Sequence, residues 1–334
     1  MTTEFTPFGK LFVTPVLPYL PGAERVDEDA YRNLLRMFLT KDNIDAGLGM
    51  IANPEASEIF YLAEDEKDRI LEITLEEVGG RVPVLAGVGH PTTAGTAAGA
   101  ARAAAAGADG LFVMPPIGML DVTTAWDADR YPEVFVDMLQ AVARVADLPM
   151  VVHPTAAPSP GYGIGLPGGA TRRIIEDVPN VVGWKMTYSY DGYRRIARLI
   201  RDSGRSIDLL GAAAKYFHEN LASQELDGTV TGALNYALEP MLEHIAAWQR
   251  DDLDAARAVW DGGLDALQDY IYSEYSRLHV RYKAAAWIRG AIPTPELRAP
   301  IPQPRREEAD EIRRLLNVMG LPVISRSDQD AYFR

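Results

Sequence analysis

The chain has 334 residues, of which 47% are hydrophobic and 24% are charged, as is typical of a globular protein. Its formal net charge of −14 argues against a nucleic-acid partner, because phosphate binding requires a basic face. The chain has no cysteine, which excludes disulfide bonds, thiolate catalysis and cysteine-based metal sites.

Signals for export or membrane insertion are not evident in the sequence. The first ten residues, MTTEFTPFGK, lack the basic region and the apolar core of a secretory signal. No apolar run reaches the roughly 18 residues that a membrane span needs. We therefore expect a cytoplasmic protein without a membrane partner.

Short apolar runs alternate with longer segments of helical periodicity over the first 250 residues. The predicted strands are Leu11–Thr14, Gly47–Ala52, Pro83–Val88, Gly110–Met114, Pro149–His153, Val181–Met186, Ile207–Gly211 and Gly228–Gly232. The predicted helices begin near Asp27 and Thr93 or span Ala63–Glu77, Tyr131–Ala146, Gly169–Glu176, Tyr193–Asp202, Lys215–Ala222 and Leu238–Gln249. Eight such units, with strands apolar on both faces, predict an α/β fold, a (β/α)₈ TIM barrel over residues 1–250.

The remaining residues, 251–334, have helical periodicity only. The predicted helices are Leu253–Tyr272, Tyr275–Arg289 and Glu307–Met319. We therefore expect a C-terminal helical appendage to the barrel.

The active site of such a barrel lies at the C-terminal ends of its strands. This rule selects a short set of positions, namely Thr14, Asn53–Glu58, His90, Pro115–Ile117, His153, Lys185, Thr187, Gly211 and Thr231. Lys185 stands out because it is embedded in the apolar strand VVGWKM. Desolvation lowers the pKa of a lysine, and a neutral amine attacks carbonyl carbon. The alternative is a lysine at a strand end whose amine reaches water.

Other titratable residues offer acid–base chemistry. His153 ends the strand PMVVH and is either a general acid/base or a hydrogen-bonded structural histidine. Glu55 and Glu58 are each either a general base, a helix cap or the partner of an arginine. Three loop tyrosines are candidate proton shuttles, namely Tyr162, Tyr188 and Tyr190. Three histidines fall on predicted helices and are interpreted as structural or surface residues, namely His218, His244 and His279.

Metal and nucleotide motifs are missing from the sequence. It contains neither His-x-His nor HExxH, and Gly87-x-Gly89 is not completed by a third glycine. We expect no metal and no cofactor.

Several ordered motifs resemble the dihydrodipicolinate synthase/N-acetylneuraminate lyase family of class I aldolases. They are FVTPVLP near the start, PEASEIFYL, AGVGH, AGADGLFVMPP, NVVGWKMT, GTVTGALN, YKAAAWIRG and LRAPIPQPRREE. The resemblance covers nearly the whole chain and implies that Lys185 forms a Schiff base with pyruvate or a longer 2-oxo acid. It also implies a homo-oligomer, a tetramer in most of the family.

The chain departs from the family pattern at the positions that handle substrate. Glu55 and Ala56 replace two threonines that bind the substrate carboxylate, and Ser57 replaces a glycine. Pro116 and Ile117 replace paired tyrosines, and His153 replaces the tyrosine proton shuttle. With this hydroxyl relay missing, the chain is predicted not to be a dihydrodipicolinate synthase. The stretch EIFYL is closer to EFFSL of 5-dehydro-4-deoxyglucarate dehydratases.

The leading hypothesis is a Schiff-base lyase, either an aldolase or a dehydratase, that acts on a 2-oxo acid. Lys185 is the predicted nucleophile and His153 the predicted proton shuttle. The predicted substrate-binding residues are Thr14, Glu55, Ala56, Ser57, Thr187, Gly211 and Val230. One alternative is a hydratase or hydrolase that uses Glu55 or Glu58 with His153 and forms no imine. The other is a non-catalytic barrel that binds a small ligand.

Overall fold

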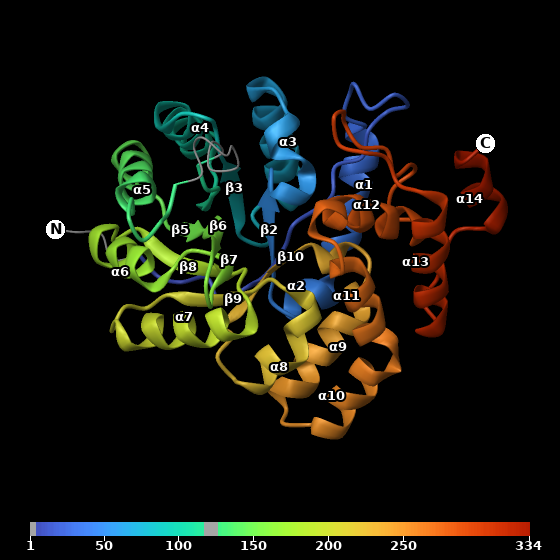
Figure 1. Cartoon of the computed structure of the whole chain (residues 1–334). Helices are drawn as coiled ribbons and strands as arrows, with labels where there is room; N and C mark the ends of the chain where they lie inside the picture. The colour runs from blue at the N-terminus through green and yellow to red at the C-terminus, as the bar shows by residue number, and fades with distance from the viewer. Residues whose placement is uncertain (1–4, 117–125) are drawn as a thin grey trace.

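The computed structural model describes residues 5–116 and 126–334. Eight parallel strands form a closed barrel in the order β1-β10-β9-β8-β5-β4-β3-β2 (Figure 1). They are β1 (Leu11–Val13), β2 (Leu48–Ala52), β3 (Val84–Val88), β4 (Gly110–Val113), β5 (Met150–Val152), β8 (Val181–Met186), β9 (Asp208–Gly211) and β10 (Gly228–Thr231). Closure comes from β1, which pairs with β2 on one side and β10 on the other. The barrel predicted from the sequence is confirmed.

Helices follow the strands and cover the outside of the barrel. They are α1 (Glu28–Phe38), α2 (Lys41–Asp45), α3 (Glu64–Val78), α4 (Thr93–Ala106), α5 (Glu133–Val145), α6 (Gly168–Asp177), α7 (Tyr190–Asp202), α8 (Phe217–Ala222) and α9 (Leu238–Gln249). Asp27, near which the sequence predicts a helix start, is the N-cap of α1, and its carboxylate accepts a hydrogen bond from the backbone of Ala30 at 3.0 Å.

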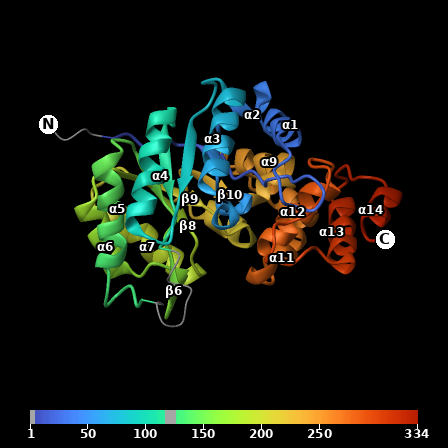
Figure 2. The same cartoon turned by 90° about the horizontal axis from the view of Figure 1, so that it is seen from above.

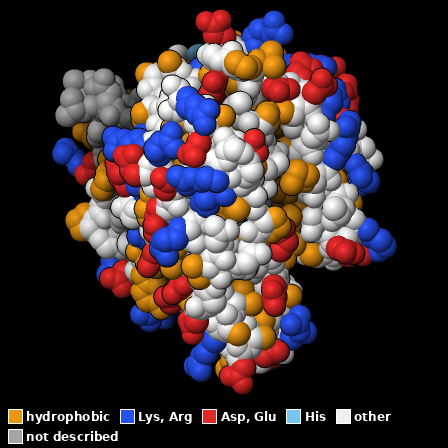
Figure 3. All heavy atoms as spheres, turned by 90° about the vertical axis from the view of Figure 1, so that its right-hand side faces the viewer, with side chains coloured by type: hydrophobic (Ala, Val, Ile, Leu, Met, Phe, Trp, Pro, Cys, Tyr) orange, Lys and Arg blue, Asp and Glu red, His pale blue; other side chains and the backbone are white. Residues whose placement is uncertain are grey.

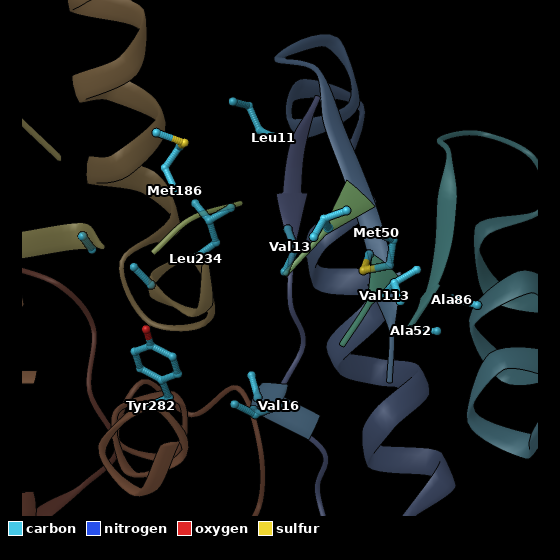
Figure 4. Packing of buried hydrophobic residues seen from close by; sticks show 14 of the residues in the cluster. Leu11, Val13, Val16, Met50, Ala52, Ala86, Val113, Met186, Leu234 and Tyr282 are labelled. Carbon is cyan, nitrogen blue, oxygen red and sulfur yellow. The ribbon is translucent and has the colours of Figure 1, made fainter. Parts of the chain in front are cut away.

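Strand residues alternate between two hydrophobic clusters, because successive side chains of a strand point to opposite faces. Phe12, Ile51 and Phe112 belong to a small cluster inside the barrel. Their strand neighbours, including Val13 and Met50, belong to the larger cluster that joins the strands to the helices (Figure 4). Both faces of each strand are therefore buried.

The C-terminal segment is helical, as predicted, but it is divided more finely. It contains α10 (Leu253–Val259), a π-helical turn (Trp260–Leu264), α11 (Asp265–Tyr272), α12 (Leu278–Ile288), α13 (Arg306–Val318) and α14 (Arg326–Tyr332). The single helix expected over Leu253–Tyr272 is interrupted at Gly263, whose φ of 117° lies outside the helical region. These helices lie on the opposite side of the barrel from α4, α5 and α6 (Figures 1 and 2).

Acidic and basic side chains are interspersed on the face that carries α13 and α14 (Figure 3). Three ion pairs there join Arg306 to Asp330, Arg314 to Glu311 and Arg326 to Asp310. This face is therefore not the uniformly basic surface that phosphate binding requires.

The structure contains a short hairpin after β5 that was not predicted from the sequence. Its strands β6 (Thr155–Ser159) and β7 (Gly163–Gly165) are antiparallel and lie in the Pro- and Gly-rich loop that follows His153. No helix in the described part of the chain is long and apolar enough to cross a membrane.

Candidate active site

The alternation within the strands directs Lys185 and His153 into the barrel. Trp184 and Met186 flank Lys185 on β8 and belong to the outer cluster, so the side chain between them points inward. Val152 likewise faces outward, which turns the next residue, His153, toward the interior. The two side chains therefore meet at the C-terminal end of the barrel.

A cavity of about 220 Å³ lies above them. The barrel contributes Thr14, Pro54, Glu55, Ala56, His153, Thr155, Ile164, Lys185, Thr187, Ala212, Ala213, Val230, Thr231 and Gly232. The C-terminal segment contributes Tyr272, Tyr275, Leu278, His279 and Tyr282. The helical appendage thus forms one wall of the cavity and is part of the candidate site.

Lys185, His153 and Glu55 form a compact cluster on the cavity wall. Nζ of Lys185 lies 2.8 Å from Nε2 of His153 and 3.4 Å from Oε2 of Glu55. The same Glu55 oxygen contacts Nε2 of His153, and Oγ1 of Thr155 contacts Nδ1 on the other side of the ring. Because both ring nitrogens have partners, the imidazole orientation is fixed.

Burial shifts the protonation of this cluster. Burial lowers the pKa of Lys185 below its ordinary value, although the Glu55 carboxylate opposes the shift. Burial also lowers the pKa of His153, again against the opposing effect of Glu55. Burial would raise the pKa of Glu55, but His153 and Lys185 outweigh it and hold that pKa well below its usual range. The arrangement therefore combines an ionised carboxylate with two groups that release protons readily.

The loop after β2 places Glu55 beside Lys185. Glu55–Ser57 form one turn of 3₁₀ helix, in which the backbone N–H of Ser57 donates to the carbonyl of Pro54. Asn53 precedes the turn with a φ of 54°, a left-handed conformation that asparagine adopts more readily than most residues. This turn points the Glu55 side chain across the barrel mouth toward β5 and β8.

Most of the predicted substrate-binding residues line the cavity, namely Thr14, Glu55, Ala56, Thr187 and Val230. Within the described part of the chain, the buried hydroxyl of Thr187 has no hydrogen-bond partner, which leaves it available to a ligand. Ser57 and Gly211 do not line the cavity. The Ser57 hydroxyl donates to the carbonyl of Pro15 at 2.5 Å. A side chain at Gly211 would meet Leu226 and Phe217, on the helix side of the strand.

Glu58 and the three candidate tyrosines lie away from the cavity. Glu58 is buried and forms an ion pair with Lys283 at 2.6 Å. Tyr188 is buried and accepts a hydrogen bond from the indole of Trp184, while Tyr190 is exposed and Tyr162 packs near Arg195. Pro116 lines a different hollow beside His90, and Ile117 lies outside the described residues.

The site includes residues that the sequence interpretation did not select. His279 was interpreted as structural or as a surface residue, but it lines the cavity, and burial lowers its pKa. Tyr272 and Tyr282 also line the cavity and contact each other through their hydroxyls, and the Tyr272 hydroxyl donates to the carbonyl of Ala212 at 3.1 Å. The helical periodicity of this segment predicts its helices but not the face that docks on the barrel.

Within residues 5–116 and 126–334, no group of three or more histidine and acidic side chains is arranged to hold a metal ion.

The sequence model of the Dihydrodipicolinate synthetase family matches residues 7–319. The chain belongs to this family. The match confirms the family expected from the motifs. An uncharacterized DapA-like lyase of Halobacterium salinarum is 28% identical over 260 residues, which cover 74% of this chain and 74% of that protein. A 4-hydroxy-tetrahydrodipicolinate synthase of Xanthomonas axonopodis pv. citri is 29% identical over 284 residues, which cover 84% of this chain and 82% of the relative.

Solved structures with the same fold include dihydrodipicolinate synthases from two other organisms. Dihydrodipicolinate synthase from Thermotoga maritima has a TM-score of 0.77 at 24% identity, and the match covers 96% of this chain and 100% of that one. The Aquifex aeolicus dihydrodipicolinate synthase has a TM-score of 0.76 at 22% identity, and the match covers 95% and 99% of the two chains. These likenesses support the fold, and the names of the relatives place the family among lyases.

Proposed function

We propose that this protein is a lyase that forms a Schiff base between Lys185 and a carbonyl substrate. The observation that carries the proposal is the position of the Lys185 amine, which is buried in a cavity 2.8 Å from the Nε2 atom of a histidine. A 2-oxo acid is the substrate class expected from the family resemblance. A homotetramer in the cytoplasm likewise stays an expectation from the sequence.

The cluster supplies the groups that imine formation needs. The neutral amine adds to the carbonyl carbon, and His153 delivers a proton to the oxygen, which leaves as water. The protonated imine then accepts the electron pair released at the adjacent carbon. In the aldolase reaction, the β-hydroxyl group gives its proton to His153 as the carbon–carbon bond breaks, and the resulting enamine takes that proton back at carbon. In the dehydratase reaction, the adjacent carbon gives a proton to His153, and this proton leaves with the β-hydroxyl group as water. Addition of water to the imine releases the product and restores the amine. Glu55 stabilises the cation throughout.

Reductive trapping tests the proposal. The protein is incubated with pyruvate, with a longer 2-oxo acid and with simple ketones in the presence of borohydride, and the modified residue is mapped by mass spectrometry. We expect a reduced adduct on Lys185 with at least one carbonyl compound and none in the Lys185→Ala variant. An unmodified Lys185 with every compound would refute imine chemistry.

A second function is favoured by the contact between His153 and Glu55. A carboxylate that orients an imidazole is an arrangement suited to activating water, and it supports a hydratase or hydrolase that forms no imine. Of the two acids considered from the sequence, Glu55 fits this role because it lines the cavity, whereas Glu58 is paired with Lys283. Lyase or hydratase activity that survives Lys185→Ala would identify this second mechanism.

A further inference from the structure

The cavity has its own carboxylate beside the nitrogen that would form the imine. Oε2 of Glu55 is 3.4 Å from Nζ of Lys185, and the same oxygen contacts His153. Among the described residues that line the cavity, Glu55 is the only carboxylate and Lys185 the only lysine or arginine. These two side chains therefore set the charge balance around the reacting nitrogen.

Imine formation places one positive charge at this nitrogen. The two hydrogens of the neutral amine leave with the carbonyl oxygen as water, and one added proton gives the cationic imine. Glu55 then lies next to a single positive charge and neutralises it. The charge balance is complete without any charge on the substrate.

A 2-oxo acid would disturb this balance. Its carboxylate is bonded directly to the imine carbon, so it would lie close to Glu55, whose side chain is only 23% exposed. Two like charges at such a distance repel strongly when solvent does not screen them. Since no second lysine or arginine is found among the described lining residues, a positively charged partner for the added carboxylate would have to be a protonated His153 or His279.

Part of the wall is suited to apolar groups. Its apolar lining residues are Ile164, Ala212, Ala213, Val230 and Leu278, and Tyr275 of the appendage adds an aromatic residue. Burial of an apolar or aromatic substituent against such a wall is favourable and needs no hydrogen bonds.

Resting on the proposed imine chemistry, we infer that the substrate is a neutral ketone or aldehyde with an apolar or aromatic substituent. Glu55 is the built-in counter-ion of its imine. In this interpretation, the side chain at position 55 takes the place of the carboxylate that a 2-oxo acid would bring into the site.

A matched pair of carbonyl compounds tests the inference. 4-Phenylbutan-2-one and 2-oxo-4-phenylbutanoate share a skeleton and differ by a methyl group in place of a carboxylate. The rate of cyanoborohydride trapping at Lys185 is measured for each, in the wild type and in Glu55→Gln. The ratio of the two rates is then compared between the proteins, which cancels the intrinsic reactivity of the compounds.

We expect the ratio of 2-oxo acid to ketone trapping to rise at least 10-fold in Glu55→Gln, because the variant lacks the negative charge. An unchanged ratio, or a wild type in which only the 2-oxo acid is trapped, overturns the inference and leaves the imine chemistry standing. If neither compound modifies Lys185 although pyruvate does, the inference alone fails; if no carbonyl compound modifies Lys185, the proposed function fails and the inference fails with it. Thermal unfolding of both proteins verifies that they are folded.

Discussion

The amine of Lys283 and the carboxylate of Glu58 form an ion pair of 2.6 Å, and each side chain is only 1% exposed. Lys283 lies on α12 of the appendage, whereas Glu58 lies in the loop after β2, three residues beyond Glu55. The other oxygen of Glu58 accepts a hydrogen bond from the backbone of Arg298 at 2.9 Å. This pair joins the appendage to the loop that positions Glu55.

We predict that Lys283→Met lowers the free energy of unfolding by about 3–5 kcal/mol, because it leaves a buried carboxylate without its cation. Burial lowers the pKa of Lys283 to about 8, so the lysine is still charged at neutral pH. Urea denaturation measures the change. The control is the double variant Lys283→Met, Glu58→Gln, which removes both charges and should be less destabilised than the single variant. Equal losses in the two variants would show that packing, and not charge, dominates.

We predict that Lys185 loses its proton at lower pH than an ordinary lysine, because burial disfavours the ammonium form. The neutral fraction of an amine rises with pH, so reactivity at Lys185 should reach its half-maximum below the ordinary pKa of about 10.4. Trace labelling with acetic anhydride, mapped by mass spectrometry, gives the titration. A lysine-containing model peptide added to the same sample is the reference.

The Glu55→Gln variant extends this prediction. Glu55 raises the pKa of Lys185 against the effect of burial, so its neutralisation should move the Lys185 midpoint to still lower pH and leave the reference peptide unchanged. A wild-type midpoint for Lys185 that coincides with that of the reference peptide would contradict a nucleophile whose pKa is lowered by burial.

We predict that His153→Gln slows imine formation by about 10²–10³-fold, since a positioned acid–base group contributes about 10²–10⁴-fold. Thr155→Val should have a smaller effect, because it removes only the hydroxyl that contacts Nδ1 of His153. Single-turnover trapping at Lys185 measures both rates. Partial recovery of the His153→Gln rate by added imidazole distinguishes proton transfer from a structural role, which imidazole would not rescue.

The sequence predicts the barrel and a lysine embedded in one of its strands because both depend on local patterns. The apolar strand around Lys185 and the apolar run that ends at His153 are visible without any long-range information. The contact between these two residues follows from the rule that the C-terminal ends of barrel strands converge.

The parts that sequence analysis missed depend on docking between distant segments. Whether His279 and Tyr282 face the barrel is decided by how α12 packs, and helical spacing alone does not show this. The break at Gly263 is also invisible, because an isolated glycine is tolerated within helices. The contact of Glu55 with both Lys185 and His153 was not predictable either, because it depends on the geometry of the turn after β2.

His244 provides a prediction outside the candidate site. This histidine is fully buried, and its Nε2 atom lies 2.9 Å from Nδ1 of His218 and accepts a hydrogen bond from the indole of Trp248 at 3.3 Å. The ring of Trp260 stacks on it with the centroids 5.3 Å apart. Burial, followed by the effect of His218, lowers the pKa of His244 from 6.5 to about 4.

Because the folded pKa of His244 is depressed, the unfolded chain binds the proton first as the pH falls. Above about pH 6.5 the residue is neutral in both states and makes no pH-dependent contribution. Between pH 6.5 and 4 the folded state should lose about 3 kcal/mol relative to the unfolded state, at 1.36 kcal/mol per pKa unit. Urea titrations at successive pH values, with His244→Phe as the matched variant, isolate this contribution. The variant keeps an aromatic ring against Trp260 but has no imidazole to protonate, so its stability should fall less steeply over this range. Identical slopes in the two proteins would show that His244 does not resist protonation in the folded state.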